Sequence, residues 1–288
     1  MPLRPEPAVV DARVLTVGPM AVVVDAAVGG RIARWEAGGL SLLAAYGDDP
    51  VEYGMYPMAP WAGRLRDNTV ISEADAVVLP VTYEAWALHG LVLSGPLEVV
   101  EHRQSDASAT LLLRRSGFPD WPWPMTVELR YLLEGTTLTT TITVIASVMP
   151  FPAVVGWHPW FRRDLGVGER LVWDADATEV AVRGADYLPT GERVPFSTAY
   201  GPFDDALVVP DGRMRLTWPG ALAVDVQSDG SWFVVFDQLP MATCIEPQSG
   251  PPNGVNDGLG APVPMAVPGR PHTQVTRWTV RDLREGRG

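Results

Sequence analysis

The run of residues 136–144, TTLTTTITV, constrains the fold of this chain more than any other feature. Nearly all of its side chains branch at Cβ, so they lose χ1 freedom in a helix and pack well on a sheet. No window of helical length in the chain carries a sustained apolar period of 3.6 residues. The sequence therefore predicts a protein built from strands.

Other strands are expected where short apolar or β-branched runs lie between turn residues. Two pairs of runs, 97–103 with 110–115 and 125–133 with 137–146, flank short polar stretches and are typical of hairpins. The remaining candidate strands are 14–17, 20–25, 170–173, 179–182, 213–218, 221–227, 232–236, 242–246 and 275–282. Turn signals at intervals of about 8–12 residues favour a sandwich or barrel. Since no linker, repeat or low-complexity tract interrupts the pattern, we expect one all-β domain of large antiparallel sheets over residues 1–288.

The charged residues exclude several classes of function. All 22 basic residues are arginine, which excludes Schiff-base enzymes, pyridoxal-phosphate enzymes and P-loops that depend on a lysine. The net charge of −12 opposes binding to a polyanion, so we expect no nucleic-acid partner. A local group of arginines could still bind a single phosphate.

Residues that commonly bind metals are few in this chain. Cys244 is the only cysteine, which excludes an intrachain disulfide and a cysteine-rich zinc site. The histidines lie too far apart in sequence for a local motif such as H-E-x-x-H; they are His89, His102, His158 and His272. We therefore expect no metal, although residues distant in sequence could still assemble a site.

The sequence carries no evident targeting signal or membrane span. The first residues, MPLRPEPAVV, lack the basic and then apolar pattern of a signal peptide. The longest apolar run, 142–157, is too short for a span and is interrupted by Pro150 and Pro152. We expect a cytoplasmic protein that has no membrane partner.

Two segments place arginine or histidine beside residues that form turns. Residues 57–67 carry Arg64 and Arg66 among prolines, a tryptophan and a glycine. This pattern favours a loop that presents guanidinium groups or, alternatively, a surface turn with solvated arginines. His89 precedes Gly90, as at the end of a strand, and is either a functional residue or a satisfied core or surface histidine.

Two further segments combine an ionisable group with aromatic or apolar neighbours. His158 lies between Trp157 and Trp160, whose rings suit either the C–H face of a sugar or a core cluster. Glu246 ends the apolar run 242–245 and precedes a rigid loop rich in proline and glycine. Unless it lies at a rim, this carboxyl is expected to be partly desolvated, which raises its pKa towards that of a useful base.

The order of these segments along the chain adds a further indication. Together with Asp204 and Asp205, which follow a Gly-Pro turn and could equally cap it, they resemble the aldose 1-epimerase (galactose mutarotase) family. The similarity covers about residues 29–278, and 123–131 and 156–161 look most like the middle of the family. The resemblance implies a galactose-mutarotase-like β-supersandwich with an open groove for a sugar. It also implies interconversion of the α and β anomers of an aldose, without a metal or organic cofactor.

The resemblance implies a set of site residues. Catalytic roles fall on His89, His158 and Glu246, and substrate contacts on Arg64, Asp204, Gln238 and the aromatic wall Trp160. Asp205 is the alternative to Asp204. Gln238 takes the place of a family glutamine upstream of the glutamate, at a short spacing. Where many members have asparagine before the arginine, this chain has Gly63.

Mutarotation needs a base for the proton of the O1 hydroxyl and an acid for the ring oxygen O5. The resemblance implies that Glu246 takes the O1 proton while His158 protonates O5, with the roles reversed in ring closure. His89 and Arg64 would hold O5 and the neighbouring hydroxyls. Each positioned acid or base contributes about 10²–10⁴-fold. Because one group must be ionised while the other is protonated, we expect a bell-shaped pH dependence.

Three other functions fit parts of the sequence. A hexose-6-phosphate epimerase would need additional arginines at the pocket, for which Arg66, Arg162 and Arg163 are candidates. A sugar-binding protein without catalysis would not need both an acid and a base. A structural β-sandwich would use its tryptophan-rich segments as interface anchors. The favoured function is an aldose 1-epimerase that acts on a small-molecule hexose, as a monomer or a homodimer.

Overall fold

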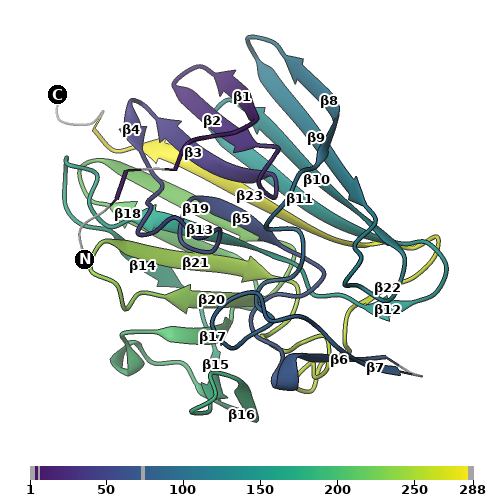
Figure 1. Ribbon diagram of the computed structural model, residues 1–288. Coiled ribbons are helices and arrows are strands. Elements are labelled where there is room, and N and C mark those ends of the chain that lie inside the picture. The colour runs from purple at the N-terminus through teal and green to yellow at the C-terminus, as the bar shows by residue number, and fades with distance from the viewer. Residues whose placement is uncertain (1–3, 6, 73–74, 285–288) are drawn as a thin grey trace.

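The structure is a computed structural model that describes residues 4–5, 7–72 and 75–284 (Figure 1). Within these residues the helical structure consists of two short 3-10 turns, η1 (Arg66–Asn68) and η2 (Thr198–Tyr200). No helix of this part of the chain has the length and apolar character that crossing a membrane requires. Strands dominate the rest, and the predicted all-β fold of large antiparallel sheets is confirmed.

The larger sheet has eleven strands, which pair antiparallel with their neighbours. In spatial order they are β1 (Ala12–Val17), β2 (Met20–Asp25), β3 (Arg31–Ala37), β5 (Met55–Met58), β13 (Gly156–Arg162), β21 (Ala242–Gln248), β20 (Trp232–Phe236), β17 (Asp204–Val208), β15 (Glu179–Arg183) and β16 (Pro189–Pro195), with β4 (Leu40–Ser41) beside β3. The central strands β5, β13 and β21 thus come from three distant parts of the chain.

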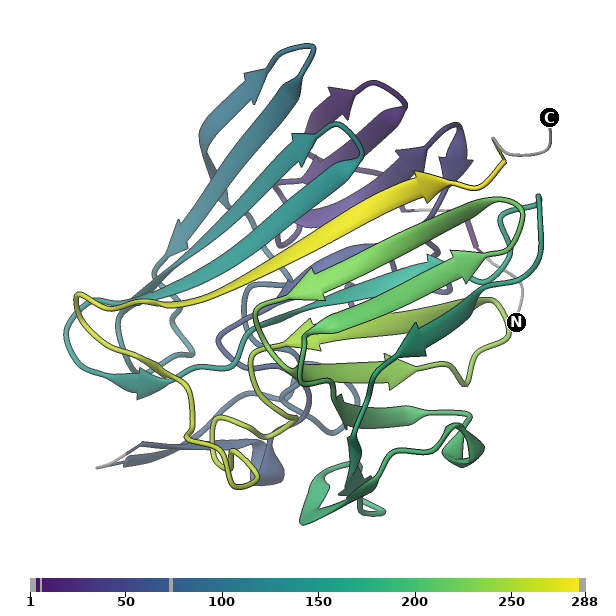
Figure 2. The ribbon, with the colours of Figure 1, turned by 180° about the vertical axis from the view of Figure 1, so that it is seen from behind.

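The smaller sheet has eight strands, also antiparallel. In spatial order they are β14 (Val172–Ala175), β18 (Arg213–Trp218), β19 (Leu222–Ser228), β23 (His272–Asp282), β11 (Thr137–Ala146), β10 (Met125–Glu134), β9 (Ser108–Ser116) and β8 (Glu98–Gln104). Two short pairs complete the strands; they are β6 (Thr69–Ser72) with β7 (Asp75–Val78), and β12 (Phe151–Pro152) with β22 (Met265–Ala266). The smaller sheet lies in front in the view from behind (Figure 2).

The two large sheets pack face to face around an aromatic core. Trp157 of the larger sheet lies edge-on against Tyr131 of the smaller one, with ring centroids 5.7 Å apart. Trp278 of β23 contacts both Trp35 and Phe161 of the larger sheet, at 6.2 and 6.1 Å. Since successive side chains of a strand point to opposite faces, the residues next to these core aromatics point away from the sandwich. The outer face of the larger sheet is therefore free to form a site.

Most predicted strands are confirmed, including both hairpins and the final strand. The expected loop 57–67 is wrong at its start, because Pro57 and Met58 belong to β5. The segment 156–162 is absent from the expected strands and forms the central strand β13. Both strands are buried on their two faces, so they lack the apolar–polar alternation by which half-buried strands are detected.

Candidate active site

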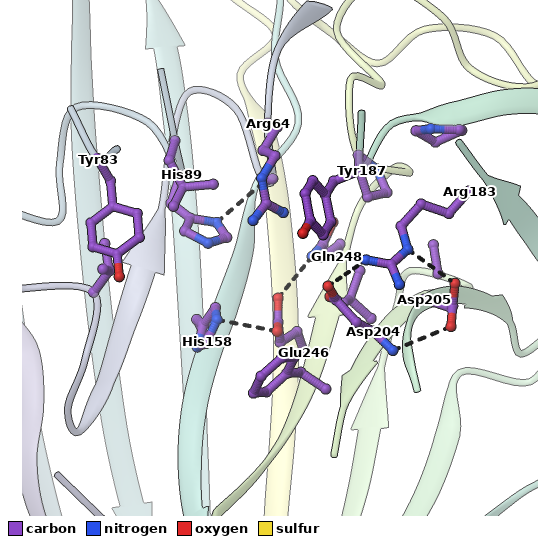
Figure 3. A pocket seen from close by; sticks show the side chains of 18 of the residues that line it. Arg64, Tyr83, His89, His158, Arg183, Tyr187, Asp204, Asp205, Glu246 and Gln248 are labelled. Carbon is purple, nitrogen blue, oxygen red and sulfur yellow. Dashed lines mark hydrogen bonds and ion pairs between the residues drawn. The ribbon is translucent and has the colours of Figure 1, made fainter. Parts of the chain in front are cut away.

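A pocket of about 240 Å³ opens on the outer face of the larger sheet. Side chains of β5, β13, β21, β20, β17 and β15 line it together with surrounding loops (Figure 3). All but one of the site residues expected from the sequence line this pocket; they are Arg64, His89, His158, Trp160, Asp204 and Glu246, with the alternative Asp205. Gln238 is the exception among the described residues, because it lies in an exposed irregular segment after β20.

The register of the central strands brings His158 and Glu246 together. Gly156 pairs with Gln248 and Trp160 with Cys244, so His158 of β13 lies directly across from Glu246 of β21. The Nε2 atom of His158 is 3.2 Å from Oε1 of Glu246, and their side chains are only 8% and 3% exposed. The second carboxyl oxygen, Oε2, accepts a hydrogen bond from Gln248 Nε2 at 3.2 Å. A buried imidazole and a buried carboxyl thus share one contact at the floor of the pocket.

Burial shifts the pKa values of this pair in opposite directions. Desolvation raises the pKa of Glu246 well above its ordinary value, and the nearby Asp204 adds to this effect. Desolvation lowers the pKa of His158 to about 3. The Tyr56 ring, stacked on the imidazole at 4.6 Å between centroids, contributes to the burial. The pair therefore holds a single proton over a wide range of pH.

His89 is positioned by a sharply turning backbone segment. Its own φ is +59° and that of Gly90 is +84°, and a Cβ at residue 90 would lie 2.1 Å from the carbonyl oxygen of Ala59. The Nδ1 atom of His89 accepts a hydrogen bond from the backbone N–H of Gly63 at 3.2 Å. Burial and the neighbouring His158 lower the pKa of His89 well below its ordinary value. The neutral ring therefore carries its proton on Nε2.

Arg64 is a cation that the protein leaves available to a ligand. Its guanidinium lies 4.7 Å from the centroid of the Tyr187 ring and 6.0 Å from that of Trp86. Among the described residues no hydrogen bond or ion pair engages it, and its Nε is buried. The residue before it, Gly63, has φ +73°, and a Cβ there would lie 2.9 Å from Pro252. Packing against Pro252 thus accounts for glycine at a position where asparagine is common.

A carboxylate wall lies opposite the histidines. Nη1 of Arg183 donates to Oδ2 of Asp204 at 2.6 Å, and Nε lies 3.5 Å from Oδ1 of Asp205. Burial raises the pKa of Asp204, an effect that the positive charges of Arg183 and Arg64 oppose. The Tyr187 ring lies 5.1 Å from the Arg183 guanidinium and therefore contacts both pocket arginines. This wall offers oxygen acceptors whose positions the arginine fixes.

Trp160 forms an enclosed wall of the pocket. Its indole Nε1 donates to the carbonyl oxygen of Val51 at 2.9 Å, and its ring lies 5.1 Å from that of His158. Only 4% of the residue is exposed, so it limits the pocket and desolvates the acid–base pair more than it offers a broad stacking surface. The aromatic segment around His158 thus serves both the site and the core.

Sequence reasoning missed several pocket residues, and four of them contact the groups described above; they are Tyr56, Arg183, Tyr187 and Gln248. Gln248 was obtainable in principle, because it lies two residues after Glu246 and shares its face if the strand continues. Pro247 and Gly250 favour a loop in the sequence, whereas in the structure β21 extends to Gln248. The other three carry no local signature and reach the site only through pairing of distant strands.

Three side chains of the metal-ligand type also meet here. A nitrogen of His158, the sulfur of Cys244 and a carboxyl oxygen of Glu246 all lie within 4.8 Å of one another, and all three residues are buried. They come from two neighbouring strands, β13 and β21. The sequence contained no local motif for such a group, which the strand register alone assembles.

Comparison with known proteins decides the family. The model of the aldose 1-epimerase family matches residues 19–227, most of the chain. The chain belongs to the aldose 1-epimerase family. The matched segment of this epimerase-family protein includes the loop of Arg64, both pocket histidines and Asp204, and it ends before Glu246. A search of curated protein sequences gave no match.

Solved structures support the same fold for this aldose 1-epimerase family member. A proposed aldose 1-epimerase of Escherichia coli K12 superposes with a TM-score of 0.81 at 21% identity, covering 94% of this chain and 99% of that one. A galactose mutarotase-like protein of Clostridium acetobutylicum also gives 0.81, at 16% identity with 93% and 94% covered. Galactose 1-epimerase of Lactobacillus acidophilus gives 0.75, at 14% identity with 92% of each chain covered.

Proposed function

We propose that this protein is an aldose 1-epimerase that interconverts the α and β anomers of an uncharged hexose. The observation that carries the proposal is the contact of His158 with Glu246 at the floor of the pocket. Binding a sugar requires hydrogen bonds only, whereas this pair adds a buried acid and base that share one proton. The family and the fold support the same reaction class.

The chemistry follows from a pair that holds one proton. The basic member removes the proton from the O1 hydroxyl, and an O1 lone pair forms the carbonyl bond to C1. The C1–O5 bond breaks, and its electron pair on O5 accepts the proton of the acidic member. We assign the O1 side to Glu246 and the O5 side to His158, so the pair reacts from the tautomer in which its single proton lies on His158 and Glu246 is ionised. Rotation about C1–C2 and reclosure by the reverse transfers give the other anomer.

The remaining pocket groups orient the sugar in this scheme. The Nε2–H of His89 and the free guanidinium of Arg64 donate to O5 and the neighbouring hydroxyls. Asp204 accepts from hydroxyls farther round the ring, held by Arg183. Trp160 encloses the reacting end. Orientation of this kind makes proton transfer effectively unimolecular.

Activity is expected to be bell-shaped in pH with a broad plateau. Because the pKa of His158 is lowered to about 3, the pair gains a second proton only in strong acid. Because the pKa of Glu246 is raised, the last proton leaves well above the ordinary carboxyl value of 4.5. Polarimetric kcat/KM across pH measures both limbs, which belong to the coupled pair. An alkaline limb with its midpoint near 4.5 would contradict this assignment.

Replacing Gln248 with leucine is expected to move the alkaline limb to higher pH. The amide hydrogen bond stabilises the ionised form of Glu246, so its loss raises the pKa of that carboxyl further. The carboxyl also loses an orienting contact, and kcat is expected to fall by about tenfold. Gln238→Leu is the matched control because Gln238 is exposed and outside the pocket. Equal effects of both substitutions would argue against the positioning role of Gln248.

The arginines considered for a sugar phosphate are engaged elsewhere. Nη1 of Arg66 pairs with Asp186 at 3.1 Å, and Nε of Arg163 donates to Thr243 Oγ1 at 2.9 Å. Of the described residues that line the pocket, none is Arg66, Arg162 or Arg163. A phosphate would therefore find none of the three arginines that the alternative required.

The charges that do line the pocket favour a neutral ligand. Arg64 and Arg183 are its two arginines, and Arg183 is paired with Asp204 and Asp205. Glu84 at the exposed edge adds another carboxylate to the lining. A dianionic phosphate would face these carboxylates with only one unpaired guanidinium, so we assign the site to the unphosphorylated sugar.

Polarimetry of freshly dissolved α-D-glucose and α-D-galactose tests the proposal. The protein is expected to speed decay to the unchanged equilibrium rotation, and the faster sugar begins to define specificity. Glucose 6-phosphate at equal concentration is expected to react more slowly. Acceleration confined to the phosphate ester would instead support the phosphosugar function. Tight binding of free sugars without acceleration would support a sugar-binding protein.

A further inference from the structure

Cys244 carries a buried thiol that the proposed reaction leaves unused. Its thiol is fully buried and forms no hydrogen bond among the described residues. On β21 it lies two residues before Glu246, so the two side chains point to the same face. The register pairs it with Trp160, beside His158 on β13. The thiol thus adjoins both members of the acid–base pair.

The geometry of the three groups approaches that of a zinc site. With Zn–N and Zn–O bonds of about 2.0–2.1 Å and tetrahedral angles, an imidazole nitrogen and a carboxyl oxygen lie about 3.3 Å apart. The observed separation of His158 Nε2 and Glu246 Oε1 is 3.2 Å. A zinc-bound sulfur lies about 3.6 Å from such ligands. All three ligand atoms already lie within 4.8 Å of one another, so a movement of the Cys244 side chain of about 1 Å completes the set.

The chemistry of the ligands selects a borderline transition metal. Nitrogen, sulfur and carboxyl oxygen are the ligand types of Zn²⁺, whereas Mg²⁺ and Ca²⁺ prefer oxygen alone. One thiolate and one carboxylate neutralise a divalent ion, which suits an enclosed site. His158 and Glu246 line the pocket (Figure 3). A fourth ligand position on a metal held by them would therefore face the pocket and be open to water or a sugar hydroxyl.

We propose that His158, Cys244 and Glu246 form an inhibitory zinc site at the floor of the pocket. The metal occupies the imidazole and carboxyl lone pairs through which the protons of mutarotation would pass. Zinc and catalysis are therefore mutually exclusive. Binding of the metal stands on the three ligands alone, whereas the inhibition rests on the proposed epimerase function.

Cobalt substitution tests the metal site directly. Titration of the whole protein with Co²⁺ is expected to give one tetrahedral site with a thiolate-to-cobalt charge-transfer absorption, which Zn²⁺ then displaces. Cys244 is the only cysteine, so the band has a single source. Cys244→Ala and Cys244→Ser are expected to abolish it and to weaken zinc binding by more than about 10–100-fold, the usual cost of losing even an outer-shell partner. His102→Ala, which alters an exposed histidine on β8, controls for adventitious surface binding.

Each outcome of this titration decides the proposal. If the wild type lacks the band, or if both cysteine variants, shown to be folded by circular dichroism, keep the wild-type zinc affinity, the site is refuted. If His102→Ala weakens zinc binding as much as the cysteine variants do, the metal lies elsewhere and the proposal falls. Retention of the band by His102→Ala, with its loss in both cysteine variants, supports the assignment.

Inhibition is measured separately by polarimetry in buffers of set free Zn²⁺. Reversible loss of activity is expected, restored by a chelator and absent with Mg²⁺. The zinc concentration for half inhibition, taken relative to each variant without metal, is expected to rise more than about tenfold in Cys244→Ala. Cobalt binding without epimerase activity would leave the site intact and refute the proposed function instead. Inhibition that is equal in the wild type and both cysteine variants would refute the inhibitory role.

Discussion

Replacing Glu246 with glutamine is expected to lower kcat for mutarotation by about 10²–10⁴-fold. Glutamine keeps the shape of the side chain but cannot accept the O1 proton, and it leaves His158 without the group that shares its proton. Sugar binding is expected to remain, because Arg64, His89 and Asp204 are untouched. Polarimetry measures kcat, and calorimetric titration with the sugar measures binding.

Glu84→Gln is the matched control for this substitution. Glu84 also lines the pocket, but it is exposed and makes no contact with the histidines that the structure records. Its loss is expected to change kcat less than about twofold. One positioned base contributes at least about 10²-fold to the rate. A Glu246→Gln protein that keeps more than about a tenth of wild-type kcat would therefore show that Glu246 is not the base.

Replacing Arg31 with methionine is expected to destabilise the fold by about 3–5 kcal/mol. This arginine is fully buried on β3 and donates from Nη1 to Tyr53 O at 3.0 Å and from Nη2 to Leu93 O at 2.9 Å. Methionine fills similar volume but donates nothing, so at least two buried carbonyls lose their partners. The guanidinium also lies 4.1 Å from the centroid of the Tyr53 ring.

Urea denaturation monitored by tryptophan fluorescence measures this loss of stability. Arg34→Met on the same strand is the control, because Arg34 is exposed and its substitution is expected to cost less than about 0.5 kcal/mol. A similar change in both variants would mean that burial of Arg31 is not what stabilises the fold. The guanidinium also lies 5.4 Å from the Tyr56 ring, which stacks on His158, so a secondary loss of kcat is expected.

The half-buried strands could be predicted because their information is local. In β10 and β11 buried side chains alternate with less buried ones, and β-branched residues fill β11. The central strands β5 and β13 have no such alternation, since both of their faces are covered. Alternation of apolar and polar residues arises where one face of a strand is exposed to water, and almost no side chain of β5 or β13 is exposed.

The site residues likewise divide into those that the sequence indicates and those that only strand pairing brings to the site. The types and order of Arg64, His89, His158 and Glu246 are legible in the sequence and carry the family resemblance. The resemblance places Gln238 near Glu246, yet it lies in an exposed irregular segment after β20, and Gln248 contacts that carboxyl instead. The reason is that β21 extends past Pro247 to Gln248, so the glutamine that shares a face with Glu246 follows it in the sequence rather than preceding it.

The all-β class, the absence of lysine chemistry and the set of ionisable groups available to a reaction can all be read from the order of amino acids. Which of these groups meet depends on how distant strands pair. The register of β13 against β21 sets the 3.2 Å contact of His158 with Glu246 and brings Cys244 beside it. A register shifted by one residue would turn one strand's side chains to the opposite face. Pairing between residues 80 to 92 positions apart is a property of the whole packed sheet, which no local pattern contains.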